Sequence, residues 1–213
     1  MQGDILIINE NHRKAAQQAL PLFLDKIKAS KNIFAITVAG ESGAGKSEIA
    51  ASIAKELDKN NITNFIFQQD DYFIHPPKTN SQIRLNDISQ VGISEVNLEM
   101  LDNEIQMAKD GQTFFEKPLV IFEKNRIDRE TVFLEDTKVL IAEGTYTTSL
   151  NNVDLRIFID RDYHDTKASR LERNRERQDY YLEQILLIEH DIISKHKDLA
   201  DIIITKEFDA IKP

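Results

Sequence analysis

The sequence predicts one three-layer α/β domain with a mostly parallel central sheet, and three observations support this fold class. Short runs rich in β-branched and apolar residues recur along the chain and alternate with segments of helical spacing. Several of these runs are apolar on both faces, which suits parallel strands covered by helices on either side. At 213 residues the chain is long enough for one substantial core but short for two full domains.

Residues 1–30 form an N-terminal extension ahead of this alternation. Ile5-Leu6-Ile7-Ile8 has the composition of a short strand. The segment from Arg13 to Ser30 has amphipathic helical spacing, and Pro21 is expected to interrupt or bend that helix because proline lacks a backbone donor. We therefore expect a strand and a helix before the core begins.

The core is expected to alternate strands and helices from residue 33 onward. Its strand candidates are short and apolar, and the segments between them carry apolar residues at helical spacing. Strands are predicted at residues 33–39, 64–68, 138–142, 155–159 and 201–205, and helices at residues 48–57 and 95–109.

Two further stretches have a different pattern. Residues 114–133 are less regular, and we interpret them as a hairpin at the edge of the sheet. Residues 166–197 have helical spacing, but nearly every side chain through Gln178 is charged or polar. This polar first half is therefore predicted to stay outside the core.

Composition excludes several classes of function. The formal charge is −9 and no extended basic stretch is present, so nucleic acid is not an expected partner. The absence of cysteine excludes disulfides, thiolate catalysis and zinc–thiolate sites. The N-terminus lacks a basic leader region and no apolar run approaches the length of a membrane span, so we expect a cytoplasmic protein without a membrane partner.

The segment Gly40-Glu41-Ser42-Gly43-Ala44-Gly45-Lys46-Ser47 fits the phosphate-binding pattern GxxxxGK[ST] and directly follows the apolar run 33–39. Three of the chain's seven glycines lie in this turn, where backbone amides can converge on phosphate oxygens and the next helix points its positive end at them. We expect a nucleoside triphosphate here, with Lys46 on the β- and γ-phosphates and Ser47 on Mg²⁺. The alternative is a glycine-rich turn that binds nothing.

Acidic residues follow two of the predicted strands. Asp70 and Asp71 come just after the strand at 64–68, and Glu143 ends the strand near 138–142. Ligands of open α/β sheets bind beyond the carboxyl ends of strands, so an acid there can hold Mg²⁺ or accept a proton from an attacking hydroxyl. Alternatively, Asp70 and Asp71 could cap a turn, and Glu143 could be a solvated carboxylate at the end of its strand.

A basic run lies at the start of the polar helical segment. Arginine offers rigid bidentate donors for phosphate. The spacing of Lys167, Arg170 and Arg173 places these three side chains on one helix face. We expect a lid over residues 163–180 that closes on the phosphoryl group, and the alternative is a solvated helix paired with Glu172 and Glu176. The basic residues are Lys167, Arg170, Arg173, Arg175 and Arg177.

The order of these motifs resembles the uridine kinase, phosphoribulokinase and pantothenate kinase group of P-loop kinases. The resemblance runs from about Ile33 to Thr205 through GESGAGKS (40–47), QDDYF (69–73), VLIAEG (139–144), FID (158–160) and the basic helix. It implies a P-loop NTPase fold with an arginine-rich helical lid. It also implies transfer of the γ-phosphoryl group of ATP, with Mg²⁺, to a hydroxyl of a small molecule.

The resemblance assigns roles to individual residues. Asp70 matches the catalytic aspartate that activates the acceptor hydroxyl, while Ser47 and Glu143 match the neighbours of Mg²⁺. Arg170 and Lys167 match the lid cations. Further candidates for contact with the acceptor are Tyr72, Arg84, Asp87 and Asn125.

The acceptor motif departs from the uridine kinase form P-x-YDF-x-x-H-x-R. The corresponding stretch is 118–127, where Val120 and Asn125 stand in place of the tyrosine and the histidine. We therefore expect uridine to be a poor acceptor. A kinase for a sugar, glycerate or vitamin and a regulatory nucleotide-binding protein without an acceptor remain alternatives. Residues 1–30 lie outside the shared core and could serve packing or dimerisation, so a homo-oligomer stays open.

Overall fold

A computed structural model describes residues 1–2, 6–173 and 179–213, and its main sheet has six strands in the order β2-β5-β1-β6-β7-β8. The first five in that order pair in parallel, and only the last is antiparallel to its neighbour. The predicted mostly parallel α/β sheet is therefore confirmed. The strands are β1 (Phe34–Gly40), β2 (Asn64–Gln68), β5 (Val139–Glu143), β6 (Leu155–Ile159), β7 (Ile202–Ile204) and β8 (Ala210–Ile211).

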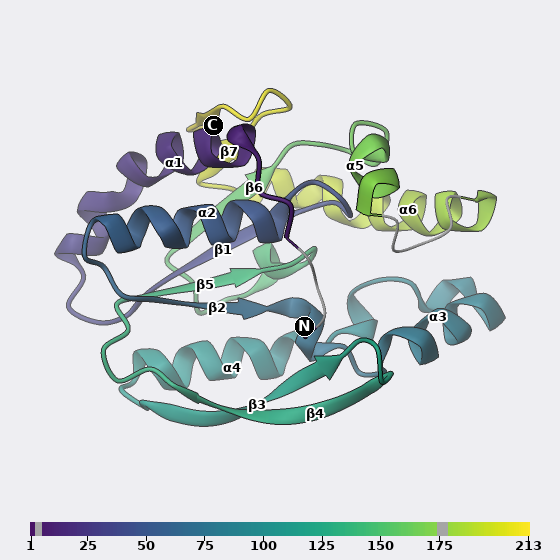
Figure 1. The fold of residues 1–213 in the computed structure, drawn as a ribbon, viewed down its shortest axis with the longest axis horizontal. Helices are drawn as coiled ribbons and strands as arrows, with labels where there is room; N and C mark the ends of the chain where they lie inside the picture. The colour runs from purple at the N-terminus through teal and green to yellow at the C-terminus, as the bar shows by residue number, and fades with distance from the viewer. Residues whose placement is uncertain (3–5, 174–178) are drawn as a thin grey trace.

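Helices and a separate hairpin cover the two faces of this sheet (Figure 1). Helices α1 (Glu10–Ala29) and α2 (Lys46–Lys59) share one apolar cluster with the sheet. On the opposite face, α4 (Leu98–Lys109) and the hairpin contribute to a second cluster. The sheet is thus the middle one of three layers.

The hairpin consists of β3 (Phe114–Ile121) and β4 (Arg126–Phe133), paired antiparallel. The hairpin itself was predicted, but its position was not. It forms a two-stranded sheet of its own and does not extend the edge of the main sheet. Phe115 and Val132 from its two strands are buried in the second apolar cluster, which explains why it covers a face.

The N-terminal extension differs from the prediction. Residues 6–9 form no strand, and Ile5 lies outside the described residues. Helix α1 begins at Glu10 because the Asn9 side chain accepts hydrogen bonds from the amides of Asn11 and His12, and it continues through Pro21. Its apolar side is buried against α2, so the extension packs on the core, and dimerisation remains a prediction.

Several helical elements were predicted with other boundaries or not at all. Helix α3 (Pro77–Asn86) lies in a stretch for which no element was predicted, and the predicted helix at 95–109 begins at Leu98, where Asn97 caps it. Residues 166–197 contain α5 (Lys167–Arg173), α6 (Tyr180–Ile193) and a 3₁₀ turn. The 3₁₀ segments are η1 (Gln69–Tyr72), η2 (Ile88–Gln90), η3 (Ile93–Glu95), η4 (Thr147–Ser149) and η5 (Ser194–Leu199). No helix in the described ranges has both the length and the apolar character needed to cross a membrane.

The strand register brings three functional segments to one edge of the sheet. Glu143 at the end of β5 pairs with Gln68 at the end of β2 and with Val38 of β1. The phosphate-binding segment follows β1 directly, and Asp70 follows β2 within η1. The predicted candidate residues therefore meet because neighbouring parallel strands end together.

Candidate active site

The phosphate-binding segment forms an open turn between β1 and α2. Gly43 and Gly45 adopt φ angles of +80° and +97°, a region that suits glycine. None of the described side chains caps the first amides of α2, so these amides remain available to an anion. The Lys46 ammonium lies across the turn and donates to the Glu41 carbonyl at 3.0 Å.

Helix α5 packs directly on this turn through Arg170. A Cβ added at Gly43 would lie 2.7 Å from Arg170 Cγ, so only glycine admits the arginine stem so closely. Arg170 Nη1 donates to the Tyr163 carbonyl at 2.7 Å, and Thr166 Oγ1 donates to the Ser42 carbonyl at 3.0 Å. Arg170 is buried, which corrects the expectation that the polar half of this segment stays outside the packed interior.

Helix α6 contacts the same turn through two adjacent residues. Ser42 Oγ donates to Glu189 Oε2 at 3.0 Å, and His190 Nδ1 lies 2.6 Å from Glu41 Oε1. Burial raises the pKa of the Glu41 carboxyl, and the hydrogen bond with His190 opposes that rise. These contacts were not predicted. The available signal was a pair of polar residues within the apolar run that became α6.

The two strand-end carboxylates lie near one another, and one of them contacts Ser47. Ser47 Oγ donates to Glu143 Oε1 at 3.1 Å. Burial raises the pKa of Glu143 to about 7, and the charge of Asp70 adds to that rise. Gly144 allows this approach, since a Cβ there would overlap the side chain of Gln69, the residue before Asp70.

Asp71 has surroundings unlike those of its neighbour. Its carboxylate accepts from Lys117 Nζ at 2.8 Å and from the Val120 amide at 3.0 Å, and all of these groups are buried. Lys117 also pairs with Glu130 at 2.7 Å. Asp71 therefore attaches the hairpin to the segment that carries Asp70.

Asp71→Asn is expected to lower the free energy of unfolding by about 3 kcal/mol, because it breaks a buried ion pair with Lys117. Urea unfolding of the purified variant measures this loss. Glu123→Gln at the exposed hairpin tip is the matched control, with an expected change within about 0.5 kcal/mol. Equal stability of the two variants would contradict the structural role of Asp71.

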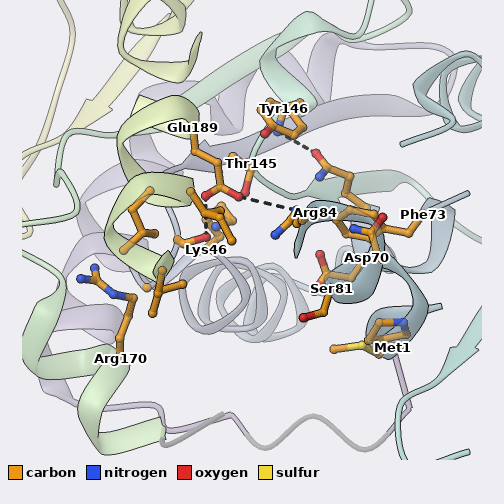
Figure 2. Close-up of a pocket in the computed structure, with 18 of the residues that line it drawn as sticks. Met1, Lys46, Asp70, Phe73, Ser81, Arg84, Thr145, Tyr146, Arg170 and Glu189 are labelled. Atoms are coloured by element: carbon orange, nitrogen blue, oxygen red, sulfur yellow. Dashed lines mark hydrogen bonds and ion pairs between the residues drawn. The ribbon is translucent and has the colours of Figure 1, made fainter. Parts of the chain in front are cut away.

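A cavity of about 520 Å³ opens between the phosphate-binding turn, η1, α3 and α6 (Figure 2). Its lining brings Lys46, Ser47, Asp70, Glu143 and Arg170 together around one space. The remaining lining residues are Met1, Ser42, Gly43, Gln69, Phe73, Pro77, Asn80, Ser81, Arg84, Leu85, Phe122, Thr145, Tyr146, Asp179, Tyr181, Leu182, Ile185, Leu186 and Glu189. No role was predicted for most of these remaining residues, because the segments that carry them are far apart in the sequence and meet only in the folded chain.

The predicted acceptor contacts divide between the cavity and other places. Arg84 lines the cavity. Tyr72 is buried outside it and donates its hydroxyl to Glu104, while Asp87 is exposed and accepts from the Ser89 amide at 3.0 Å. Asn125 lies at the hairpin tip, where its side chain accepts from the Lys78 amide of α3 at 2.7 Å. It does not line the cavity.

The remaining lid residues are placed less directly at the cavity. Lys167 is exposed, pairs with Glu183 at 3.8 Å, and does not line the cavity. Arg175, Arg177 and the side chain of Arg173 lie outside the described residues. Closure of a lid over residues 163–180 stays a prediction.

The donor set beside the phosphate-binding turn fits Mg²⁺. Within the described ranges, no group of three or more His, Cys, Asp or Glu side chains could hold a metal alone. Mg²⁺ usually takes one or two carboxylates and completes its coordination with substrate phosphates and water. Glu143, Asp70 and the Ser47 hydroxyl match this pattern, and a cation would offset the repulsion between the two carboxylates.

Comparisons with known proteins agree with this arrangement. A sequence profile of the Phosphoribulokinase / Uridine kinase family matches residues 35–209. The uridine kinase of Clostridium tetani (strain Massachusetts / E88) is 26% identical over 191 residues, which span 82% of this chain and 88% of that protein.

Two solved structures share the fold at low sequence identity. The putative fructose transport system kinase from Silicibacter sp. TM1040 gives a TM-score of 0.60 at 15% identity, covering 87% of this chain and 94% of that one. D-glycerate 3-kinase from Cryptococcus neoformans var. grubii serotype A gives 0.59 at 12% identity, covering 96% and 100%.

The family match covers the main sheet from β1 to β7, the phosphate-binding turn, the strand-end acids and both helices that contact the turn. Members of this family are phosphotransferases whose acceptor group is a hydroxyl. The chain therefore belongs to the Phosphoribulokinase / Uridine kinase family of P-loop kinases.

Proposed function

We propose that the chain transfers the γ-phosphoryl group of ATP to a hydroxyl of a small molecule, with Mg²⁺ at Ser47, Asp70 and Glu143. The observation that carries the proposal is that these three side chains, Lys46 and Arg170 all line one cavity. Phosphoryl transfer needs mainly positioning and charge neutralisation, so this clustering is the feature that matters chemically.

The nucleotide end of the cavity is the phosphate-binding turn. Amides of residues 40–47 and the N-terminus of α2 would bind the triphosphate, and Lys46 would neutralise the β- and γ-oxygens. Arg170 packs its side-chain stem on Gly43 and lines the same space, and its guanidinium, which donates to the Tyr163 carbonyl, would turn to meet the transferred group. Bidentate donors of this kind are suited to phosphate.

The metal would be held by the Ser47 hydroxyl and by the carboxylates of Glu143 and Asp70. An ion held there would supply positive charge to neutralise the phosphoryl group during transfer. Glu143 is positioned for this contact by its hydrogen bond with Ser47 at 3.1 Å. Gly144 lets the adjoining segment approach Gln69, the residue before Asp70, so both acids could serve one ion.

Asp70 is proposed as the residue that orients the acceptor hydroxyl and accepts its proton. It is half-buried and lines the cavity, whereas Asp71 is committed to Lys117 and Val120. A general base contributes about 10²–10⁴-fold to a rate. The structural role of Asp71 supports the assignment, because it holds η1 and with it Asp70 against the hairpin.

The names of related proteins do not agree on an acceptor, since they include a uridine kinase and a D-glycerate 3-kinase. Two residues argue against uridine here. Val120 is fully buried in β3, and Asn125 is bonded to α3, so neither side chain can take the nucleoside-reading role. A site built to make such hydrogen bonds can prefer its substrate by about 10⁴-fold, and a site without them loses that preference.

The test is ADP release measured against a panel of nucleosides, sugars, sugar phosphates, glycerate and vitamins. We expect at least one acceptor to raise ADP release well above the acceptor-free rate, and we expect uridine and cytidine to have low kcat/KM. Efficient use of uridine would contradict the argument that Val120 and Asn125 make uridine a poor acceptor. ATP hydrolysis that no acceptor stimulates would favour the regulatory alternative.

A further inference from the structure

Helix α1 reaches the phosphate-binding turn through a buried histidine. A Cβ added at Gly45 would lie 3.0 Å from His12 Nε2 and 3.4 Å from its Cδ2, so the edge of the imidazole rests against the backbone of this glycine. His12 is 7% exposed, and Gly45 is the N-cap residue of α2. The contact is therefore made at the residue directly before Lys46 and Ser47.

The conformation of Gly45 decides where the first amides of α2 point. Its φ of +97° lies in the left-handed region, and its carbonyl accepts from the Ile49 amide at 2.9 Å. Turns of this kind bind phosphate oxygens with backbone amides that converge from successive residues. A rotation at Gly45 would redirect the amides of Lys46 and Ser47 away from a shared phosphate.

The start of α1 holds the imidazole of His12 in one orientation. Its Nδ1 accepts from the Asn9 amide at 3.2 Å, and the Asn9 side chain accepts in return from the His12 amide at 3.2 Å. Burial lowers the pKa of His12, while the charge of Glu48 in the first turn of α2 opposes that shift. The ring is therefore neutral at pH 7, and because Nδ1 accepts, its proton lies on Nε2 at the edge that faces Gly45.

The C-terminal part of the chain supports the same ring. Phe208 meets His12 edge-on with the ring centroids 5.4 Å apart, and Arg161 Cζ lies 4.7 Å from the centroid of Phe208. Phe208 is buried and adopts a φ of +62°, which costs energy for a bulky residue. Such conformations persist where the surroundings enforce them, and they concentrate at functional sites.

Helix α1 is an addition to the part of the chain that matches the family. The match begins at residue 35, so His12 lies outside it, whereas Gly45 and Phe208 lie within it. Helix α1 runs beside α2 on one face of the sheet and shares an apolar cluster with it (Figure 1). The contact between His12 and Gly45 is thus a feature that α1 adds to the shared core.

We propose that His12 is a positioning residue for nucleotide binding, which keeps Gly45 in its left-handed conformation and so directs the amides of Lys46 and Ser47 at the phosphates. His12 does not line the cavity, so it acts through Gly45. This inference rests on the proposed function, because it takes the turn to be the site of a nucleoside triphosphate.

The first test measures the dissociation constant of Mg-ADP by titration calorimetry. His12→Gln is the informative variant, because glutamine at this third helical position can accept from the Asn9 amide and retain the cap of α1, but it has no ring to rest on Gly45. We expect Mg-ADP to bind about tenfold more weakly, the loss of about one hydrogen bond to phosphate. In ADP-release assays the variant should raise the KM for ATP and leave kcat unchanged.

Leu20→Ala is the matched control. Leu20 is buried on the same helix in the cluster shared with α2, about 12 Å along the helix axis from His12. Its truncation should lower the unfolding midpoint more than His12→Gln does, while the affinity for Mg-ADP stays at the wild-type value. A loss of affinity that follows the loss of stability in both variants would assign His12 a packing role and overturn the proposal.

Phe208→Leu tests whether the second aromatic ring acts through the first. It removes the edge contact with His12 but keeps an apolar side chain in place. If Phe208 acts on the turn only through that contact, the double variant with His12→Gln should bind Mg-ADP as tightly as His12→Gln alone. Fully additive losses would contradict the arrangement of Phe208, His12 and Gly45 as one support.

Lys46→Ala in the same titration separates this inference from the proposed function. We expect the wild-type chain to bind Mg-ADP and Lys46→Ala to bind it far more weakly. If that difference is found but His12→Gln binds like the wild-type chain, the nucleotide site stands and the role of His12 is refuted. A wild-type chain that does not bind Mg-ADP would overturn the inference and the proposed function together.

Discussion

Lys46→Ala is expected to abolish phosphoryl transfer while the fold stays intact. The substitution removes the cation that we propose to lie nearest the γ-phosphate, but the glycines that shape the turn remain. Transition-state charge then lacks its main neutralising side chain in the turn. Initial rates of ADP release with a saturating acceptor measure the loss, and circular dichroism monitors the fold.

Lys55→Ala is the matched control for this variant. Lys55 lies on the same helix α2 but is exposed, so its loss removes a similar charge without touching the cavity. We expect the control to keep its activity. Full activity of Lys46→Ala would exclude the turn at residues 40–47 as the ATP site.

Asp70→Asn is expected to reduce kcat by about 10²–10⁴-fold, because the amide cannot act as the general base that we propose for Asp70. The loss would be larger if the placement of Mg²⁺ also fails. ATP binding should largely survive, since the amides of the turn and Lys46 are unchanged. The measurement is kcat with the true acceptor, together with a titration by Mg-ATP.

Asp71→Asn is the informative comparison, because the two acids are adjacent but have different surroundings. It should lose stability through Lys117 and retain more activity per folded molecule than Asp70→Asn. If Asp71→Asn proves inactive while folded and Asp70→Asn is nearly normal, the assignment of the base is wrong by one residue.

The fold was largely predictable because its main signals are local. Each parallel strand is a short run that is apolar on both faces, and the residues 33–39 and 64–68 correspond closely to β1 and β2. The start of α1 was missed although Asn9 is a typical capping residue. Strand β8 has two residues, too few to show periodicity.

The candidate site was predictable only where its residues lie close together in the sequence. The turn at residues 40–47 is one continuous motif, so its residues could be named from sequence. Arg84 instead depends on Glu95 and Glu189, which reach it from η3 and α6. Contacts between distant segments leave no periodic signal in the sequence.

The most direct test of the central claim follows a label from the γ-phosphate of ATP. The wild-type chain is incubated with labelled ATP, Mg²⁺ and the acceptor found by the panel, and the products are separated. The account predicts that the label moves to a hydroxyl of the acceptor, and that Asp70→Asn slows this transfer by the factor expected for kcat. Label that appears only as inorganic phosphate, at the same rate with and without the acceptor, would contradict it.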